Sequence, residues 1–249
     1  DGATLRLVAR ATAEGGAFAE TTLGLTVVRA DVLVSADRVF EESAGELTSG
    51  TTLVCAGGTT TLPAQTTLRR LVVLPGATVT HVAADARGLD LGVEDLFVAA
   101  GATMDVRGKG YPGGLTAANS LVEGLSPDGP AGAPGIGGTH VGRGAAGDPG
   151  AVGVAGASYG SFFEAYDPGA GGGGLSEGLP REGGDGGGVF RLFANRAVID
   201  GVVTGAGEAS AAGAGAGGAI RFDTWDGILG AGRVEVSGGD GDGGGGGGM

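Results

Sequence analysis

Short apolar runs, each followed by a glycine-centred bend and a second short apolar run, repeat along the chain from residue 30 onward. The segment 53–61 (LVCAGGTTT) aligns with 71–79 (LVVLPGATV) and again with 96–104 (LFVAAGATM). Short apolar runs bounded by glycine are typical of β-strands. One such unit cannot bury its apolar face alone, whereas stacked units can. The pattern therefore predicts an all-β fold, a β-solenoid with coils of about 18 to 30 residues.

The same unit returns near the C-terminus with an arginine at a fixed place. Residues 187–193 (GGVFRLF) and 217–223 (GGAIRFD) share the pattern G-G-x-apolar-R-apolar, and each is followed by a second apolar strand. A glycine run then follows, at 205–218 and again from 238 onward. These segments predict further coils of the solenoid over residues 189–249.

Two segments with alternating apolar and polar residues open the chain, at Thr4–Thr12 and Ala19–Val28. They are separated by Glu14-Gly15-Gly16, and alternation interrupted by glycine indicates a β-hairpin. Residues 1–29 are therefore expected to form a hairpin that caps the solenoid. The hairpin also resembles the last two strands of a bacterial immunoglobulin-like repeat, so this second interpretation stays open.

Glycine returns at every third position over residues 129–156, with a single interruption. A period of three fits polyproline II, which has three residues per turn, and glycine lets neighbouring backbones approach closely. We therefore expect the first coils over 30–112 and an excursion of bundled polyproline II segments over 113–188. Collagen is disfavoured because prolines are sparse. A disordered linker is disfavoured because apolar residues such as Ile136 and Val152 persist.

Composition and charge narrow the range of partners. Of the 249 residues, 59 are glycine and the net charge is −13. Nucleic acid is excluded as a partner because phosphate binding needs clustered Lys and Arg. No apolar run approaches the ~20 residues that span a bilayer. The single cysteine, Cys55, permits no internal disulfide and fits a small buried apolar residue.

The segment 159–167 (YGSFFEAYD) is the one aromatic cluster of the sequence, and it sets aromatic rings beside carboxylates. Such groups bind or cleave sugars. Alternatively, the phenylalanines seal the glycine bundle against the solenoid and Glu164 caps a turn. Trp225, which has aspartates on both sides, is either an exposed platform for a ligand or fills a corner of a coil. The candidate ligand-binding residues are Tyr159, Phe162, Phe163, Glu164, Tyr166, Asp167 and Trp225.

No cofactor, catalytic residue or dedicated metal site is expected. Asp185, Asp240 and Asp242 lie in glycine-rich segments that approach the calcium-binding nonapeptide pattern without matching it. These carboxylates serve turns and solubility, or they hold calcium loosely together with backbone carbonyls.

The tetrapeptide YPGG at 111–114, the glycine-flanked segment 159–174 and the units of 187–248 resemble known repeats. They are similar to the glycine-rich, β-helix-type regions of very large bacterial secreted or cell-surface proteins. This resemblance implies a right-handed parallel β-helix in an extracellular, adhesin-like protein. The third-place glycines also resemble the polyproline II bundles in receptor-binding tips of some phage tail fibres. The lack of an initiator Met suggests a slice of a longer polypeptide.

These observations favour a non-catalytic structural or adhesive module whose partner is a carbohydrate or another surface protein. The second hypothesis is a β-helix-type polysaccharide lyase or glycoside hydrolase. Its carboxylates would be Asp105, Glu164 and Asp167, and they would have to converge on one groove. The third is an ice- or surface-binding polyproline II array, which needs regular Thr or Ala on one face.

Overall fold

The computed structural model describes the chain except residues 1–2, 13–17, 28, 84, 86, 131, 147–153, 162 and 179. For residues 3–12 and 18–27, and for residue 242, only the backbone is described. This part of the chain is almost entirely β-strand and extended loop, and the one helical turn in it is the 3-10 helix η1 (Glu42–Ala44). The expectation of an all-β chain is therefore confirmed.

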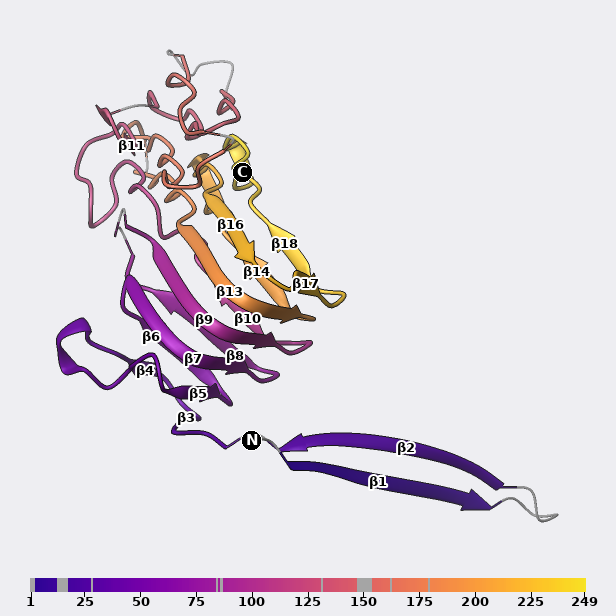
Figure 1. The fold of residues 1–249 in the computed structure, drawn as a ribbon. Helices are drawn as coiled ribbons and strands as arrows, with labels where there is room; N and C mark the ends of the chain where they lie inside the picture. Colours follow the sequence, from indigo (N-terminus) through magenta and orange to yellow (C-terminus); the bar gives the residue numbers. More distant parts are fainter. Residues whose placement is uncertain are drawn as a thin grey trace.

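Two parallel sheets form the body of the molecule (Figure 1). The first contains, in spatial order, β16 (Ala219–Thr224), β13 (Val189–Ile199), β9 (Leu89–Val98), β7 (Gln65–Val73), β5 (Thr52–Cys55) and β3 (Val32–Val34), with β17 (Ile228–Leu229) also beside β13. The second contains β18 (Arg233–Glu235), β14 (Val202–Thr204), β10 (Thr103–Asp105), β8 (Ala77–His81), β6 (Gly58–Leu62) and β4 (Arg38–Val39). Along the sequence the chain alternates between the two sheets.

Segments that repeat in the sequence lie side by side in the sheets. Leu53 pairs with Leu71, Leu71 pairs with Leu96, and Arg191 pairs with Arg221. The predicted alignments match the registers of the first sheet and of β8 with β10. Between β6 and β8 the prediction is one residue off, because Thr59 pairs with Thr78 and not with Ala77. A one-residue slip would turn every apolar side chain outward, so burial fixes these registers. Each buried Leu contributes about 1.5–3 kcal/mol. The core between the sheets includes Leu53, Cys55, Leu71, Val79, Leu96, Met104 and Val203.

The N-terminal strands β1 (Ala3–Thr12) and β2 (Phe18–Val27) pair with each other antiparallel. The register runs from Ala3 opposite Val27 to Thr12 opposite Phe18. The predicted hairpin is confirmed, and its turn lies outside the described residues. Figure 1 shows the hairpin extending away from the two sheets.

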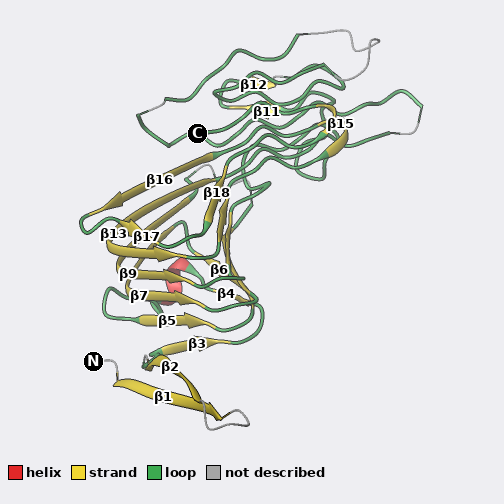
Figure 2. Ribbon diagram, turned by 90° about the vertical axis from the view of Figure 1, so that its right-hand side faces the viewer, coloured by secondary structure: helices red, strands yellow, loops and turns green. Residues whose placement is uncertain are grey.

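A glycine-rich layer of extended segments lies at one end of the sheets (Figure 2). Its short strands are β11 (Leu125–Ser126), β12 (Gly129–Pro130), β15 (Ser210–Gly213) and β19 (Gly241–Gly243). The other segments bond to one another through the backbone. Gly172 N donates to Gly184 O over 2.9 Å, and Gly184 N donates to Gly213 O over 2.9 Å. A Cβ on any of these three glycines would lie closer than 3.0 Å to a carbonyl of another segment, so glycine permits the approach.

The first glycines of the three-residue series have positive φ. Gly129, Gly132 and Gly135 have φ values of 104°, 92° and 68°, whereas polyproline II requires φ near −75°. The expectation of polyproline II over 129–135 is therefore wrong, because glycine serves there as the residue that adopts positive φ without a steric cost. Later members of the series lie outside the described residues: Gly147, Gly150 and Gly153.

Most of the glycine-rich layer, residues 106–188, is one insertion between β10 and β13, and the glycine runs after β14 and β18 complete it. β13 pairs in parallel with β9, with Phe190 beside Leu89 and Ile199 beside Val98. The chain therefore leaves the second sheet after β10 and passes through the glycine-rich layer. It re-enters the first sheet as β13, which pairs with β9, the last strand of that sheet before the insertion.

Candidate ligand-binding site

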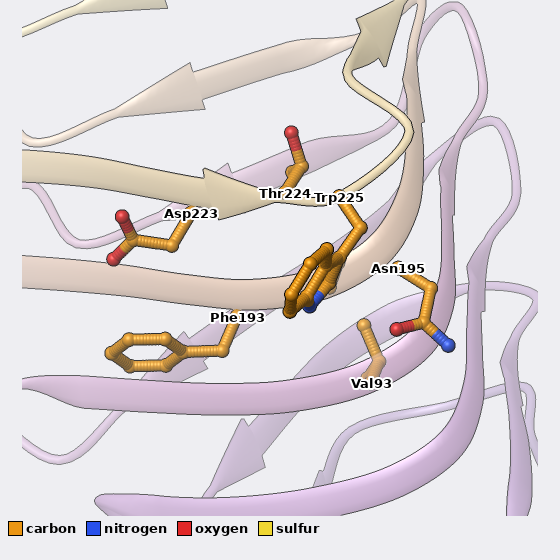
Figure 3. Close-up of a pocket in the computed structure, with 7 residues that line it drawn as sticks. Val93, Phe193, Asn195, Asp223, Thr224 and Trp225 are labelled. Carbon is orange, nitrogen blue, oxygen red and sulfur yellow. The ribbon is translucent and has the colours of Figure 1, made fainter.

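A hollow of about 500 Å³ lies on the outer face of the first sheet (Figure 3). The strand registers create it, because Ala194 pairs with both Val93 and Thr224, and Phe193 pairs with Asp223. Val93 and Ala194 are nearly buried and form its floor. Its complete lining is Val93, Phe193, Ala194, Asn195, Asp223, Thr224 and Trp225.

Trp225 is the most prominent side chain of the hollow. Its backbone N donates to Ala194 O over 3.2 Å, and Asp226 N donates to Asn195 O over 2.8 Å, which fixes Trp225 beside Asn195. The indole is 89% exposed, so it does not fill a corner of a coil. Figure 3 shows it between the Phe193 ring and the Asn195 amide. An open aromatic face beside polar groups suits a ligand with an apolar face and hydroxyls.

The polar groups of the hollow are of two kinds. The Asp223 carboxylate accepts bonds from Arg221, from Nε to Oδ2 over 2.8 Å and from Nη2 to Oδ1 over 3.3 Å. These bonds raise the pKa of Arg221 and neutralise the Asp223 charge locally. Among the described contacts, the Asn195 amide and the Thr224 hydroxyl have no protein partner. Figure 3 shows the Asn195 amide beside the indole and the Thr224 hydroxyl directed away from it, so the amide is the group placed to bond to the hydroxyls of a ligand.

The aromatic segment 159–167 does not gather into one pocket. The Tyr159 hydroxyl donates to Pro168 O over 2.8 Å, and its ring lies 5.0 Å from the ring of His140. Burial raises the pKa of Tyr159. Phe163 is 90% exposed, so the expectation that it seals the bundle is wrong. Phe162 lies outside the described residues, and Asp167 is half-buried.

Tyr166 joins the glycine-rich layer to the first sheet. Its ring lies 4.6 Å from the Cζ atom of Arg191, a cation–π contact. Arg191 is only 7% exposed. Its guanidinium pairs with the Asp90 carboxylate and donates to Arg87 O over 2.7 Å and to Ala165 O over 3.4 Å. A nearly buried guanidinium is costly to leave without partners, so its contacts with Ala165 and Tyr166 hold these two residues against β13.

Glu164 lies close to this contact and to the hollow. Its backbone N donates to Ser161 O over 3.4 Å, so the backbone closes the turn that the side chain was expected to cap. Beyond the bonds to Asp223, the groups of Tyr166 and Glu164 further raise the pKa of Arg221. Glu164 and the hollow residue Asp223 therefore both act electrostatically on Arg221, and Glu164 is not among the residues that line the hollow.

The carboxylates of the enzymatic hypothesis do not converge. Asp105 lies on β10 in the second sheet, and its Oδ2 accepts a bond from Arg107 Nη2 over 3.0 Å. Glu164 and Asp167 belong to the glycine-rich layer. No contact in the described part of the chain links Asp105 to either.

A different pair of carboxylates, Asp185 and Glu208, lies where the glycine-rich layer meets the sheets. Burial raises the pKa of both, and the charge of Asp185 raises that of Glu208 further. The Asp185 Oδ1 accepts a bond from Gly113 N over 2.7 Å, and Lys109 lies near both acids. No sequence signal indicates this pair, because its members lie in separate glycine runs.

The described residues contain no group of three or more His, Cys, Asp or Glu that could hold a metal ion. Of the three aspartates considered for calcium, Asp185 bonds to the backbone of Gly113. The backbone carbonyl of Asp240 accepts a bond from Ser210 N over 3.0 Å. The side chain of Asp242 is outside the described part of the chain.

Comparison of the chain with models of protein families, with curated proteins and with solved structures gives no match in any of the three. Within the described residues, no helix has the length and apolar character needed to cross a membrane.

Proposed function

We propose that this chain is a structural and adhesive module of a secreted or cell-surface protein, in which a β-solenoid carries a bundle of polyproline II segments. Strands that alternate between two parallel sheets support the solenoid, because each passage through both sheets stacks on the one before. Backbone bonds between glycine segments support the bundle, because polyproline II has no internal hydrogen bonds. The location outside the cell is proposed from the resemblance of the repeats alone.

The proposed ligand of the hollow is a neutral carbohydrate. The observation that carries this proposal is the exposed Trp225 indole beside the Asn195 amide, which has no protein partner among the described contacts. A sugar ring has an apolar face that stacks on an aromatic ring and hydroxyls that bond to amides. The net charge of −13 disfavours acidic polysaccharides.

Binding without cleavage is proposed because the hollow lacks the groups of a glycosidase. Hydrolysis of a glycosidic bond uses two carboxylates roughly 5–9.5 Å apart. Of the residues that line the hollow, Asp223 alone carries a carboxylate, and Arg221 neutralises it. A lyase or hydrolase acting here would need a second acid that the lining does not supply.

The test is retention of the purified chain on neutral and acidic polysaccharides, with parallel measurement of new reducing or unsaturated ends. We expect retention on at least one neutral polysaccharide, no new ends, and about tenfold weaker binding for Trp225→Ala. Phe163→Ala is the matched control, because Phe163 is equally exposed and lies outside the hollow. Equal loss in both variants, no retention at all, or release of new ends would each refute the proposal.

A further inference from the structure

The two ends of the stacked sheets differ in how well their apolar side chains are covered. At the end formed by β3 and β4, the inward-facing Val34 and Phe40 are 3% and 4% exposed, whereas the alternate residues Leu33 and Val39, which face outward, are 61% and 59% exposed. At the end formed by β16, β17 and β18, Val234 is 50% exposed and Ile228 is 44% exposed. Their register partners one strand inward are Val203 and Ala197, and both are fully buried. Among the described residues, inward-facing side chains that continue the rows of the core are thus left open at the β16–β18 end.

At that open end, the backbone of Met249 pairs with the start of β16. Ala219 N donates to Gly188 O over 3.1 Å where β16 joins β13, and Met249 N donates to Gly218 O over 3.0 Å. Ile220 N in turn donates to Met249 O over 2.8 Å. Met249 therefore takes the same position relative to β16 that Ala219, the first residue of β16, takes relative to β13.

The glycine residues that precede these positions repeat the same bond in successive coils. Gly188 N donates to Val106 O, Gly218 N to Gly205 O, and Gly248 N to Val236 O, each over 2.7 Å. In the first two cases the donor comes directly before a strand of the first sheet, and its acceptor comes just after a strand of the second. By this geometry, Gly248 and Met249 occupy the first positions of another coil.

We propose that the end formed by β16, β17 and β18 is a docking surface for one further parallel coil of the same pattern as residues 189–218 and 219–248. The coil pairs with the free edge of β16 from Arg221 onward and covers Ile228, Phe222 and Val234 with its own apolar side chains. A sheet edge of unpaired backbone groups beside open apolar residues is a template for strand addition. At the β3–β4 end the inward-facing Val34 and Phe40 are already buried, so that end offers no open core position to a second copy of the chain stacked head to tail, which disfavours such a copy as the occupant.

The proposal makes a residue-specific claim about backbone amides. Because Ile220 N points to the free edge, the alternate amides of Phe222 and Thr224 face the same edge. The amides of Arg221 and Asp223 face β13. Only the first pair gains hydrogen bonds when a coil docks.

The experiment appends a copy of residues 220–249 directly after Met249 and follows amide hydrogen exchange in β16. We expect the exchange of Phe222 and Thr224 to slow at least tenfold, with little change at Arg221 and Asp223. The control carries one additional glycine at the junction, which shifts the register and turns the apolar side chains of the appended coil outward. Equal exchange in the two proteins would overturn the proposal.

A second pair of variants keeps the proposal testable if the appended coil perturbs folding. Val234→Lys should leave the melting temperature of the original chain unchanged, because the side chain is half exposed. In the extended chain it should abolish the gain in melting temperature, because the lysine would be covered. If the appended coil does not raise the melting temperature, the proposed occupant is refuted. It is also refuted if the original chain forms a dimer in which the amides of Phe222 and Thr224 are already protected from exchange.

Discussion

The close packing of glycine segments predicts a large difference between two glycine-to-alanine substitutions. Gly186 is buried, and a Cβ there would lie closer than 3.0 Å to the Gly169 and Ala170 carbonyls. Gly247 is exposed, and a Cβ there meets no atom within 4 Å. Neither glycine has a positive φ, so backbone strain does not differ between them. The variants Gly186→Ala and Gly247→Ala therefore isolate the cost of separating two backbones.

The magnitude follows from the contacts of Gly186. Overpacking costs about 1–3 kcal/mol. Moving the segment also weakens the bonds from Gly110 N to Gly186 O, at 2.7 Å, and from Gly186 N to Tyr111 O, at 2.9 Å, each worth about 1 kcal/mol. Alanine regains about 0.4–1 kcal/mol through the unfolded chain. We therefore expect Gly186→Ala to lower the free energy of unfolding by about 3 kcal/mol, and Gly247→Ala to raise it by about 0.5 kcal/mol.

Urea denaturation followed by circular dichroism measures the difference as a shift of the midpoint. Repeat arrays can unfold in parts, so amide exchange at Gly110 and Gly172 should accompany it. Gly186→Ala should speed exchange at these amides, whereas Gly247→Ala should not. If both variants unfold at the same midpoint, the glycines are not in the close contact on which the bundle depends.

Three further predictions concern the buried His81 and the partners of the nearly buried Arg191. Burial lowers the pKa of His81 from 6.5 to about 4. Between these two pH values the unfolded chain binds more protons than the folded chain, so the free energy of unfolding falls by up to about 3 kcal/mol as the pH drops from 6.5 to 4. His81→Leu should flatten this dependence in urea midpoints at pH 7 and 4.5, and an unchanged slope would contradict the burial of a neutral ring. Asp90→Asn should cost about 3 kcal/mol in chemical denaturation because it leaves the Arg191 charge nearly buried without its partner, and a cost below 1 kcal/mol would show that water replaces the carboxylate. Tyr166→Leu should cost about 1 kcal/mol and Tyr166→Phe much less, since the ring alone faces Arg191; equal costs would point to the hydroxyl.

The fold was predictable where stacking leaves a repeat in the sequence. Leu53, Leu71 and Leu96 occupy one ladder, and in-register burial demands similar residues at each rung. The glycine-rich layer was less predictable, because a three-residue period has the same appearance whether glycine permits close packing or positive φ. Gly129 and Gly132 show the second use.

The candidate site was predictable in part. Trp225 stood out as an isolated indole, but its neighbours Phe193 and Asn195 did not. The signal was available, because extending the alignment of Arg191 with Arg221 by four residues sets Asn195 beside Trp225. The segment 159–167 could not be assigned from sequence, because adjacent residues of an extended segment point in different directions.

The hollow and the open end of the stack are neighbours, which couples the two proposals. Val93, Ala194 and Thr224 pair in register, so the residues that follow them, Glu94, Asn195 and Trp225, occupy equivalent places in successive coils, and all three are exposed. A docked coil would add a fourth residue beside the indole. It would also shield one face of Trp225. A ligand that contacts both Trp225 and the new residue would stabilise the docked coil, and the coil would raise the affinity for that ligand by the same factor. A long neutral polysaccharide should therefore gain more affinity than a disaccharide when the coil is appended, because strands about 4.8 Å apart lengthen the row by one residue. If the affinities for the polysaccharide and the disaccharide rise by the same factor, the coil changes only the environment of Trp225 and adds no contact of its own.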